Sequence, residues 1–403
     1  MTRQQISGIS KIIGRAVVAT FAVAAPVLAT AGTASAAPTA FTPGDLVIYR
    51  VGAGAVTLSS VATAVSLDDY STSGTYSGYS VALPTTASGN QRAVTASGSA
   101  TSEGLISDTA DGYLLASGYD AAPGTTGVAS TTCTSGVGTY RSIAVVSGSG
   151  SIDSSTGICH GLSGNNVRGV AANSGTTGSG IWVTGAGGLD YVTIGSSSDG
   201  LALTTSNLRA ADLYNGQLYA SSASGANRLA TVGSGEPTTA GQTVANLSGI
   251  TSTNSTSPYQ FWFTSLNGTN PDTLYVADNT TGITKYVYST SAGTWTETGS
   301  VAQSNITGIV GQVSGSSVVL YVTSPSGLYS LTDTAAATST LSGTPTLLAS
   351  AGTNEAFRGL AFAPTAQPAA QTPESPLAIA LPAAAVAIIG GAVVLGRRRR
   401  NPA

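Results

Sequence analysis

Four short apolar runs decide how this chain folds: Val167-Arg168-Gly169-Val170-Ala171, Gly180-Ile181-Trp182-Val183, Leu189-Asp190-Tyr191-Val192-Thr193-Ile194 and Leu201-Ala202-Leu203. Their alternation of apolar and polar residues, with many β-branched and aromatic side chains, is typical of β-strands. Glycine, serine and asparagine between the runs are typical of turns. Residues 167–203 therefore predict a unit of four short strands.

The second run of this unit recurs along the chain as an apolar pair whose second member is usually aromatic. The pairs are Ile48-Tyr49, Leu114-Leu115, Ile181-Trp182, Leu218-Tyr219, Leu274-Tyr275 and Leu320-Tyr321. Recurrence at intervals of roughly 40–65 residues, with strand-like pieces between, indicates a repeated β unit. Four strands repeated about six times predict an all-β fold, a β-propeller of six blades, with seven blades as the alternative.

The two ends of the repeat region predict how the ring closes. Leu46-Val47-Ile48-Tyr49-Arg50 is a second-strand phrase with no first strand before it, and Phe357-Arg358-Gly359-Leu360-Ala361-Phe362 is a first-strand phrase with no second strand after it. We expect these two segments to pair and complete one blade, because pairing removes an exposed sheet edge. The rival interpretation, a string of sandwich domains, fits neither the even spacing nor the split blade. The propeller is therefore assigned to residues 42–364.

Three phrases carry a resemblance to a group of uncharacterised exported bacterial propeller proteins. They are Pro43-Gly44-Asp45-Leu46-Val47-Ile48-Tyr49-Arg50, Thr273-Leu274-Tyr275-Val276-Ala277-Asp278 and Phe357-Arg358-Gly359-Leu360-Ala361-Phe362-Ala363-Pro364. The likeness covers most of residues 42–364. It implies a propeller fold and export, and it implies no activity.

Both ends of the chain are typical of targeting segments. Residues 1–36 combine basic residues, an Ala/Val-rich stretch and a small-residue cleavage site, which predicts a signal peptide. Residues 365–376 are a Pro-rich spacer, and the uncharged residues 377–396 are long enough for one transmembrane helix. The basic tail 397–403, which begins with four arginines, predicts a cytoplasmic end and a propeller outside the cell. The tail resembles bacterial surface-sorting tails, although the Leu-Pro-x-Thr-Gly pattern is absent.

The segment between these ends is acidic. Residues 37–376 contain eight basic and eighteen acidic residues, a net charge of −10. Phosphate contacts require Lys and Arg, and this segment has a single lysine, so we do not expect a nucleic-acid partner.

Cys133 and Cys159 are the only cysteines, and outside the cell they are expected to form a disulfide. The chain-entropy relation gives about 3 kcal/mol of stabilisation for such a loop. Two thiols beside the lone His160 supply too few ligands for a zinc site. No residue is assigned as catalytic, because a Ser-His-Asp hydrolase would have to use His160 and no nucleophile elbow is present.

One column of residues marks the start of each first strand. The column is Glu103, Arg168, Arg209, Gln260, Thr307 and Arg358. Because first strands line the channel of a propeller, we expect these side chains to ring one mouth of it, with loops at Asp120 and Asp278-Asn279 above. Three converging arginines would bind a carboxylate or phosphate. Alternatively they are structural, with Glu103 as a partner of Arg168.

Calcium is the alternative ligand. Glu103 and Asn305 could be two ligands near the channel, with Asp108 and Asp212 further along the first strands. The stretch Asp278-Asn279-Thr280-Thr281-Gly282 has some features of a calcium loop but is better explained as a turn. Calcium takes about six to eight oxygens, and this sequence does not show that set.

The sequence therefore predicts a non-catalytic propeller on the cell surface that binds a ligand. The expected partners are an anionic small molecule, an envelope polysaccharide or a protein, and no cofactor is expected. The alternative function is a calcium-dependent hydrolase or lyase whose site lies at the channel mouth.

Overall fold

The structure is a computed structural model that describes residues 38–268 and 271–364. The predicted signal peptide (1–36), the spacer (365–376), the predicted membrane helix (377–396) and the basic tail (397–403) lie outside the described residues. Within the described ranges, no helix combines the length and the apolar character needed to cross a bilayer. Their one helical element is the short 3-10 turn η1 (Val128–Ser130).

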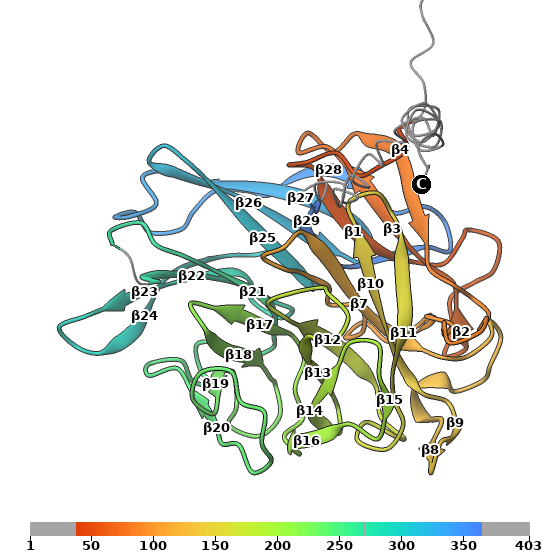
Figure 1. The fold of residues 1–403 in the computed structure, drawn as a ribbon. Coiled ribbons are helices and arrows are strands. Elements are labelled where there is room, and N and C mark those ends of the chain that lie inside the picture. Colours follow the sequence, from red (N-terminus) through yellow and green to blue (C-terminus); the bar gives the residue numbers. More distant parts are fainter. Residues whose placement is uncertain (1–37, 269–270, 365–403) are drawn as a thin grey trace, which may run out of the picture. The chain divides into compact units, whose positions relative to one another are not determined.

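Six sheets form the blades of a propeller, and each runs outward from an inner strand (Figure 1). Blade 1 contains β29 (Ala356–Phe362), β1 (Leu46–Val51), β3 (Val65–Tyr70) and β4 (Tyr76–Ala82). Blade 2 contains β6 (Ser107–Asp108), β7 (Tyr113–Tyr119), β10 (Arg141–Ser147), β11 (Ile152–Ile158) and β15 (Ser197–Ser198). Blade 3 contains β12 (Val167–Ala171), β13 (Gly180–Gly185), β14 (Gly188–Thr193) and β16 (Leu201–Thr204).

The remaining three blades follow the same order. Blade 4 contains β17 (Ala211–Tyr214), β18 (Gln217–Ser221), β19 (Leu229–Val232) and β20 (Val244–Asn246). Blade 5 contains β21 (Pro258–Thr264), β22 (Thr273–Asp278), β23 (Gly282–Ser289) and β24 (Thr294–Val301). Blade 6 contains β25 (Gly308–Ser314), β26 (Ser317–Ser324), β27 (Gly327–Asp333) and β28 (Thr346–Ser350). The prediction of a six-bladed propeller is confirmed.

The ring closes through the predicted split blade. Strand β29 pairs with β1 in antiparallel register, with Leu46 opposite Phe362 and Val51 opposite Ala356. Arg50 strengthens this closure, because its Nη1 lies 2.9 Å from an oxygen of Glu355, the residue just before β29. Two ends of the chain that are about three hundred residues apart in sequence therefore form one sheet. The interpretation as a string of sandwich domains is wrong.

The repeated aromatic residue has a structural cause. In each repeat the second residue of the pair packs against the following blade. The hydroxyl of Tyr49 donates to Ser117 O in blade 2, and the indole N–H of Trp182 donates to Pro237 O in blade 4. Tyr275 packs among blade 6 residues and Tyr321 among blade 1 residues. One large side chain per blade therefore supplies much of the apolar contact between neighbouring sheets.

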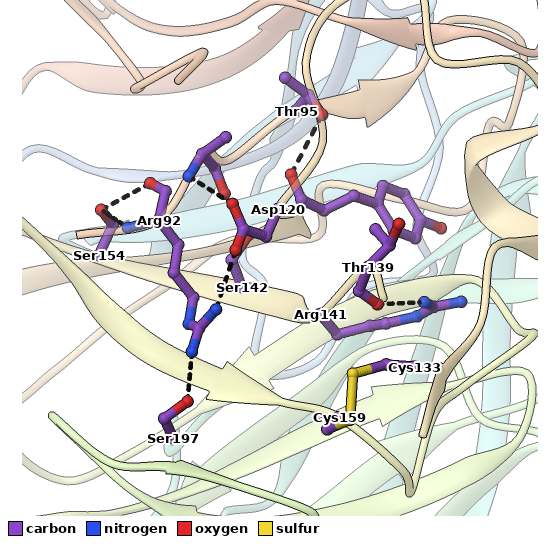
Figure 2. Close-up of polar contacts among 12 residues, drawn as sticks. Arg92, Thr95, Asp120, Cys133, Thr139, Arg141, Ser142, Ser154, Cys159 and Ser197 are labelled. Carbon is purple, nitrogen blue, oxygen red and sulfur yellow. Dashed lines mark hydrogen bonds and ion pairs between the residues drawn. A yellow bond between two sulfur atoms is a disulfide. The ribbon is translucent and has the colours of Figure 1, made fainter. Parts of the chain in front are cut away.

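The predicted disulfide is confirmed. Cys133 and Cys159 are bridged, and both are buried (Figure 2). Cys133 lies in β8 (Cys133–Thr134), which pairs with β9 (Val137–Gly138) in the loop before β10, and Cys159 follows β11. A further small sheet joins β2 (Ala62–Thr63) to β5 (Ala96–Ser97). The bridge therefore fixes a long loop of blade 2 to the end of that blade's fourth strand.

Candidate functional site

The six column positions lie in one ring around the channel. Hydrogen bonds join each blade to the next at this level, and most of them involve the column residues themselves. The bonds are Leu105 N to Arg168 O (3.0 Å), Thr184 Oγ1 to Arg209 O, Arg209 Nη1 to Pro258 O (3.1 Å), Gln260 N to Thr307 O (3.2 Å), Thr307 Oγ1 to Arg358 O (3.2 Å) and Gly359 N to Gly104 O (3.0 Å). The inner strands are therefore bonded in a complete circle at their first residues.

Glycine follows the column residue in four of the six blades because the next inner strand lies too close for a side chain. A Cβ on Gly359 would lie 2.6 Å from Gly104 O, and one on Gly169 would lie 2.7 Å from Arg209 O. Contacts under 3.0 Å to backbone require the backbone to move. The pattern of a polar residue, then glycine, then an apolar residue is thus the sequence signature of this ring.

Arg168 and Arg209 are the half-buried cations of the ring. Each uses its Nη1 to donate to the blade that follows. Arg168 donates to Asn207 Oδ1 (2.5 Å) and Leu208 O (3.0 Å), and Arg209 donates to Ser257 Oγ (2.9 Å). Neither guanidinium forms an ion pair with a described carboxylate. The two arginines are therefore oriented by neutral acceptors and keep further N–H donors.

The other four column residues are buried and bonded to protein. Glu103 accepts hydrogen bonds from Ser97 N, Tyr119 Oη and Asn166 Nδ2, at 2.6–2.8 Å. Its partners are therefore these three groups, and it forms no ion pair with Arg168. Thr307 donates to Arg358 O, as described above. Glu103 thus holds the ring together and is not free to bind a ligand.

Gln260 closes the channel. Its Nε2 donates to Ile106 O (2.6 Å) and Leu360 O (3.2 Å), and its Oε1 accepts from Leu360 N (3.0 Å). Ile106 belongs to blade 2 and Leu360 to blade 1, whereas Gln260 extends from blade 5, so the side chain reaches across the channel. The side-chain amide of Gln260 therefore separates the end of the channel that contains Arg168 and Arg209 from the opposite end.

Arg358 is the most deeply placed cation of the ring, with a side chain that is 1% exposed. It donates to Phe357 O and Gly98 O, while its Nε is buried without a partner. Burial lowers the pKa of Arg358. The Nε of Arg168 is likewise buried and unpartnered. Two donors at this end of the channel thus lack an acceptor among the described residues.

Positive charge is concentrated at the end of the channel that contains Arg168, Arg209 and Arg358. Burial lowers the pKa of Arg168, and the neighbouring charge of Arg209 lowers it further. The centre of the Tyr259 ring lies 4.1 Å from the Arg209 guanidinium carbon. Tyr259 is a member of the site that the column pattern missed, because it lies one position before Gln260 and its type does not recur. An anion between Arg168 and Arg209 would relieve their mutual repulsion.

The remaining basic residues of the described propeller are otherwise engaged. Arg50, Arg92 and Lys285 form ion pairs with carboxylates. Arg141 and Arg228 are buried and donate to backbone carbonyls. Only Arg168 and Arg209 are at once partly exposed and free of a carboxylate partner within the described ranges.

The two loops that were expected above this end have structural bonds. Figure 2 shows Arg92 between Asp120 and Ser197, and the Arg92 Nη1 to Asp120 Oδ2 distance is 2.9 Å. Asp278 accepts from Ser257 N, Thr280 N and Thr281 N, at 2.8–3.1 Å. These bonds are those of a capped turn, so the carboxylates of Asp120 and Asp278 are occupied.

Asp108 and Asp212 are brought together beyond Gln260, at the other end of the channel. Both line a cavity of about 50 Å³. Enclosure by protein raises the pKa of Asp108, although the side chain remains accessible to water. Burial, followed by the charge of Asp108, raises the pKa of Asp212 to about 7.

This pair is not a calcium site on the residues present. Two carboxylates supply fewer oxygens than the six to eight that calcium takes. Glu103 is fully bonded on the far side of Gln260, and Asn305 is an exposed turn residue with a φ of 60°. No group of three His, Cys, Asp or Glu side chains suited to a metal occurs within residues 38–268 and 271–364. The described residues therefore do not fit the calcium-dependent alternative.

Asp190 is a further carboxyl with a raised pKa, and unlike Asp108 and Asp212 it was not singled out from the sequence. It lies on β14, is 1% exposed, and its Oδ2 is buried without a hydrogen-bond partner. A Cβ on Gly161 would lie 1.5 Å from this oxygen, so the loop backbone covers it directly. Burial raises the pKa of Asp190 to about 7. No sequence signal could have found it, because an aspartate in a strand usually faces solvent.

The fold and the ring define the protein as a six-bladed β-propeller with an arginine-lined end. No family model matches the chain, and no curated protein matches it significantly. Solved structures match weakly. A nidogen/laminin complex has a TM-score of 0.44 at 12% identity, over 79% of this chain and 98% of that one. A candidate 6-phosphogluconolactonase from Bacteroides fragilis has a TM-score of 0.41 at 11% sequence identity, over 79% of this chain and 97% of that one. Hydrazine synthase from Kuenenia stuttgartiensis has a TM-score of 0.33 at 10% sequence identity, over 56% of this chain and 57% of that one. At these scores the likenesses carry no argument about function.

Proposed function

We propose that this protein is a non-catalytic propeller that binds an anionic ligand between Arg168 and Arg209. The observation that carries the proposal is the state of these two guanidinium groups. They are half-buried on adjacent blades, they are oriented by neutral acceptors, and neither has a carboxylate partner. A carboxylate or phosphate oxygen is the group that such donors bind best.

The net charge of the propeller supports binding of an anion at the end of the channel that contains Arg168 and Arg209. Its surface is acidic overall, and its other basic side chains are paired or buried. An anion would be repelled from most of the surface and attracted to this end, since neither guanidinium there is ion-paired with a carboxylate. A carboxylated sugar, free or as part of an envelope polysaccharide, is the ligand class that we favour, and an acidic protein segment is the other.

The same proposal includes the location of the protein. We infer an exported chain whose signal peptide is removed and which residues 377–396 anchor in the plasma membrane with the propeller outside. Support for this comes from the sequence of the two ends alone. If the chain is truncated after residue 364, we expect the propeller to be released into the medium.

We expect Arg168→Gln and Arg209→Gln each to weaken binding of galacturonic acid about 10- to 100-fold. Hydrogen bonds to charged groups contribute about 1.5–3 kcal/mol each, which corresponds to that range. Isothermal titration calorimetry with galacturonic acid, citrate and inorganic phosphate as probes measures the effect. Melting temperatures recorded in parallel separate lost binding from lost folding.

Arg92→Gln is the matched control, because Arg92 is also half-buried but is paired with Asp120. It should leave probe binding unchanged. If the unaltered protein binds none of the three probes, or if both arginine variants lose stability while keeping full affinity, the arginines are structural and the proposal is wrong.

A further inference from the structure

Lys285 is the one lysine of the propeller and is fully buried. The other seven basic residues between residues 37 and 376 are all arginines. Arginine is the usual choice for a buried ion pair because its planar fork matches a carboxylate. Lysine differs chemically in one respect that matters here, because its nitrogen can lose a proton and act as a nucleophile, whereas a guanidinium stays protonated.

The partner of Lys285 is held in contact with it. Lys285 lies on β23 of blade 5 and Asp333 ends β27 of blade 6, and their exposed fractions are 0% and 2%. Lys285 Nζ lies 2.8 Å from Asp333 Oδ2. Because Oδ2 is bonded directly to Cγ, the nitrogen is near the attack distance of about 3–3.5 Å. The carbonyls of Ala336 and Ser339 accept from Nζ at 2.6 and 2.8 Å and fix its position.

Two hydroxyl groups donate hydrogen bonds to the Asp333 carboxylate. Tyr275 Oη donates to Asp333 Oδ2 at 2.6 Å, and Ser339 Oγ donates to Asp333 Oδ1 at 2.7 Å. Burial and the bond to Asp333 raise the pKa of Tyr275, so its hydroxyl remains a donor. Tyr275, Leu331 and Ala336 belong to one apolar cluster, and the side chains of Lys285 and Asp333 are almost completely shielded from solvent.

We propose that Lys285 and Asp333 condense to form an amide that joins blade 5 covalently to blade 6. A proton first moves from the ammonium to Oδ2 along their hydrogen bond, which produces an amine beside a carboxylic acid. The Nζ lone pair then attacks Cγ, the Cγ–Oδ2 bond breaks, and Oδ2 leaves as water with a second proton from Nζ. The pair contains every atom of both products, so no other reactant is needed.

Each neighbouring group has a role in that step. Ser339 Oγ stabilises the negative charge that develops on Oδ1 in the tetrahedral intermediate. Tyr275 Oη donates to Oδ2, the oxygen that leaves. The fixed contact between Lys285 and Asp333 holds the two reacting groups together. In well-oriented intramolecular reactions such proximity corresponds to an effective concentration of about 10⁵–10⁸ M. Replacing two buried charges by a neutral amide also removes their desolvation penalty.

Mass spectrometry of the reduced, denatured chain tests the proposal directly. The mass should be lower than that of the sequence by one water. A protease that cleaves after lysine should fail to cut at residue 285, and because the only other lysine is Lys11, the digest is simple to read. A chain of full mass that is cut completely at residue 285 contains an ion pair only, and the proposal is then wrong.

Several variants test the roles of the neighbouring residues, so the test does not fail if one variant does not fold. Tyr275→Phe and Ser339→Ala should lower the fraction of uncut chain after a fixed time, which a merely structural role would not do. Asp333→Ala must be cut completely at residue 285, because it has no carboxyl for Lys285 to attack. An Asp333→Ala chain that resists cleavage at residue 285 would overturn the assignment of the partner.

Discussion

Asp190→Asn is expected to remove a large part of the pH dependence of unfolding between pH 4 and 7. In the folded protein the pKa of Asp190 is about 7, against an ordinary value of 3.8. Because the folded state holds this proton more tightly, its contribution to stability is complete below pH 3.8 and is lost as the pH rises to about 7. The loss is about 1.4 kcal/mol per pH unit and about 4 kcal/mol in total.

At pH 8 the asparagine variant should therefore be the more stable protein. The gain is reduced by about 1–3 kcal/mol, because the position of the unpartnered Asp190 Oδ2 would be taken by an amide group that also has no hydrogen-bond partner. A net increase of roughly 1–3 kcal/mol remains, measured by urea unfolding at pH 5 and pH 8. Asp199→Asn is the control, since this carboxylate is exposed and precedes Gly200, which lies beside Asp190. Parallel profiles for the unaltered protein and the Asp190 variant would show that Asp190 is ionised in the fold.

Gly359→Ala is expected to destabilise the propeller by at least about 3 kcal/mol, because a well-packed backbone contact has no room for a methyl group. A Cβ at this position would lie 2.6 Å from Gly104 O, 2.8 Å from Ile106 N and 2.8 Å from Leu105 Cα. All three atoms are backbone, so the inner strands of blades 1 and 2 must separate. That movement also lengthens the Gly359 N to Gly104 O bond at the point where the ring closes.

Urea unfolding followed by the fluorescence of Trp182, Trp262 and Trp295 measures this effect. Gly268→Ala is the matched control, because a Cβ there meets no atom within 4 Å and the change should alter stability by less than about 0.5 kcal/mol. Equal stability of the two variants would mean that the inner strands can shift at little cost, and the ring of hydrogen bonds would then not hold the blades in place.

Much of the fold could be predicted because its signals are local and repeated. The pair Ile48-Tyr49 recurs in altered form in every blade, since each blade must bury a large side chain against the next. Pairing of β1 with β29 followed from two incomplete phrases at the ends of the repeat region. The disulfide followed from there being two cysteines and from the expectation that the propeller is exported.

The candidate site was predicted only in part. Arg168 and Arg209 were found because they occupy equivalent positions in successive repeats. Gln260 and Glu103 occupy the same column, yet their side chains are used to close the channel and to bond neighbouring loops. Sequence position shows which level of the channel a residue occupies, but the direction of its side chain depends on the acceptors nearby.

The chain's own pattern of residues determined a propeller of about six blades and the split blade that closes it, because strand periodicity leaves a mark at every repeat. Tertiary structure alone decided which charges are paired and which are not. Lys285 and Asp333 are far apart in sequence, and the isolation of Asp190 depends on a loop from another blade. Electrostatic environment is a property of distances in space, and neither a single residue nor its neighbours in the chain encodes it.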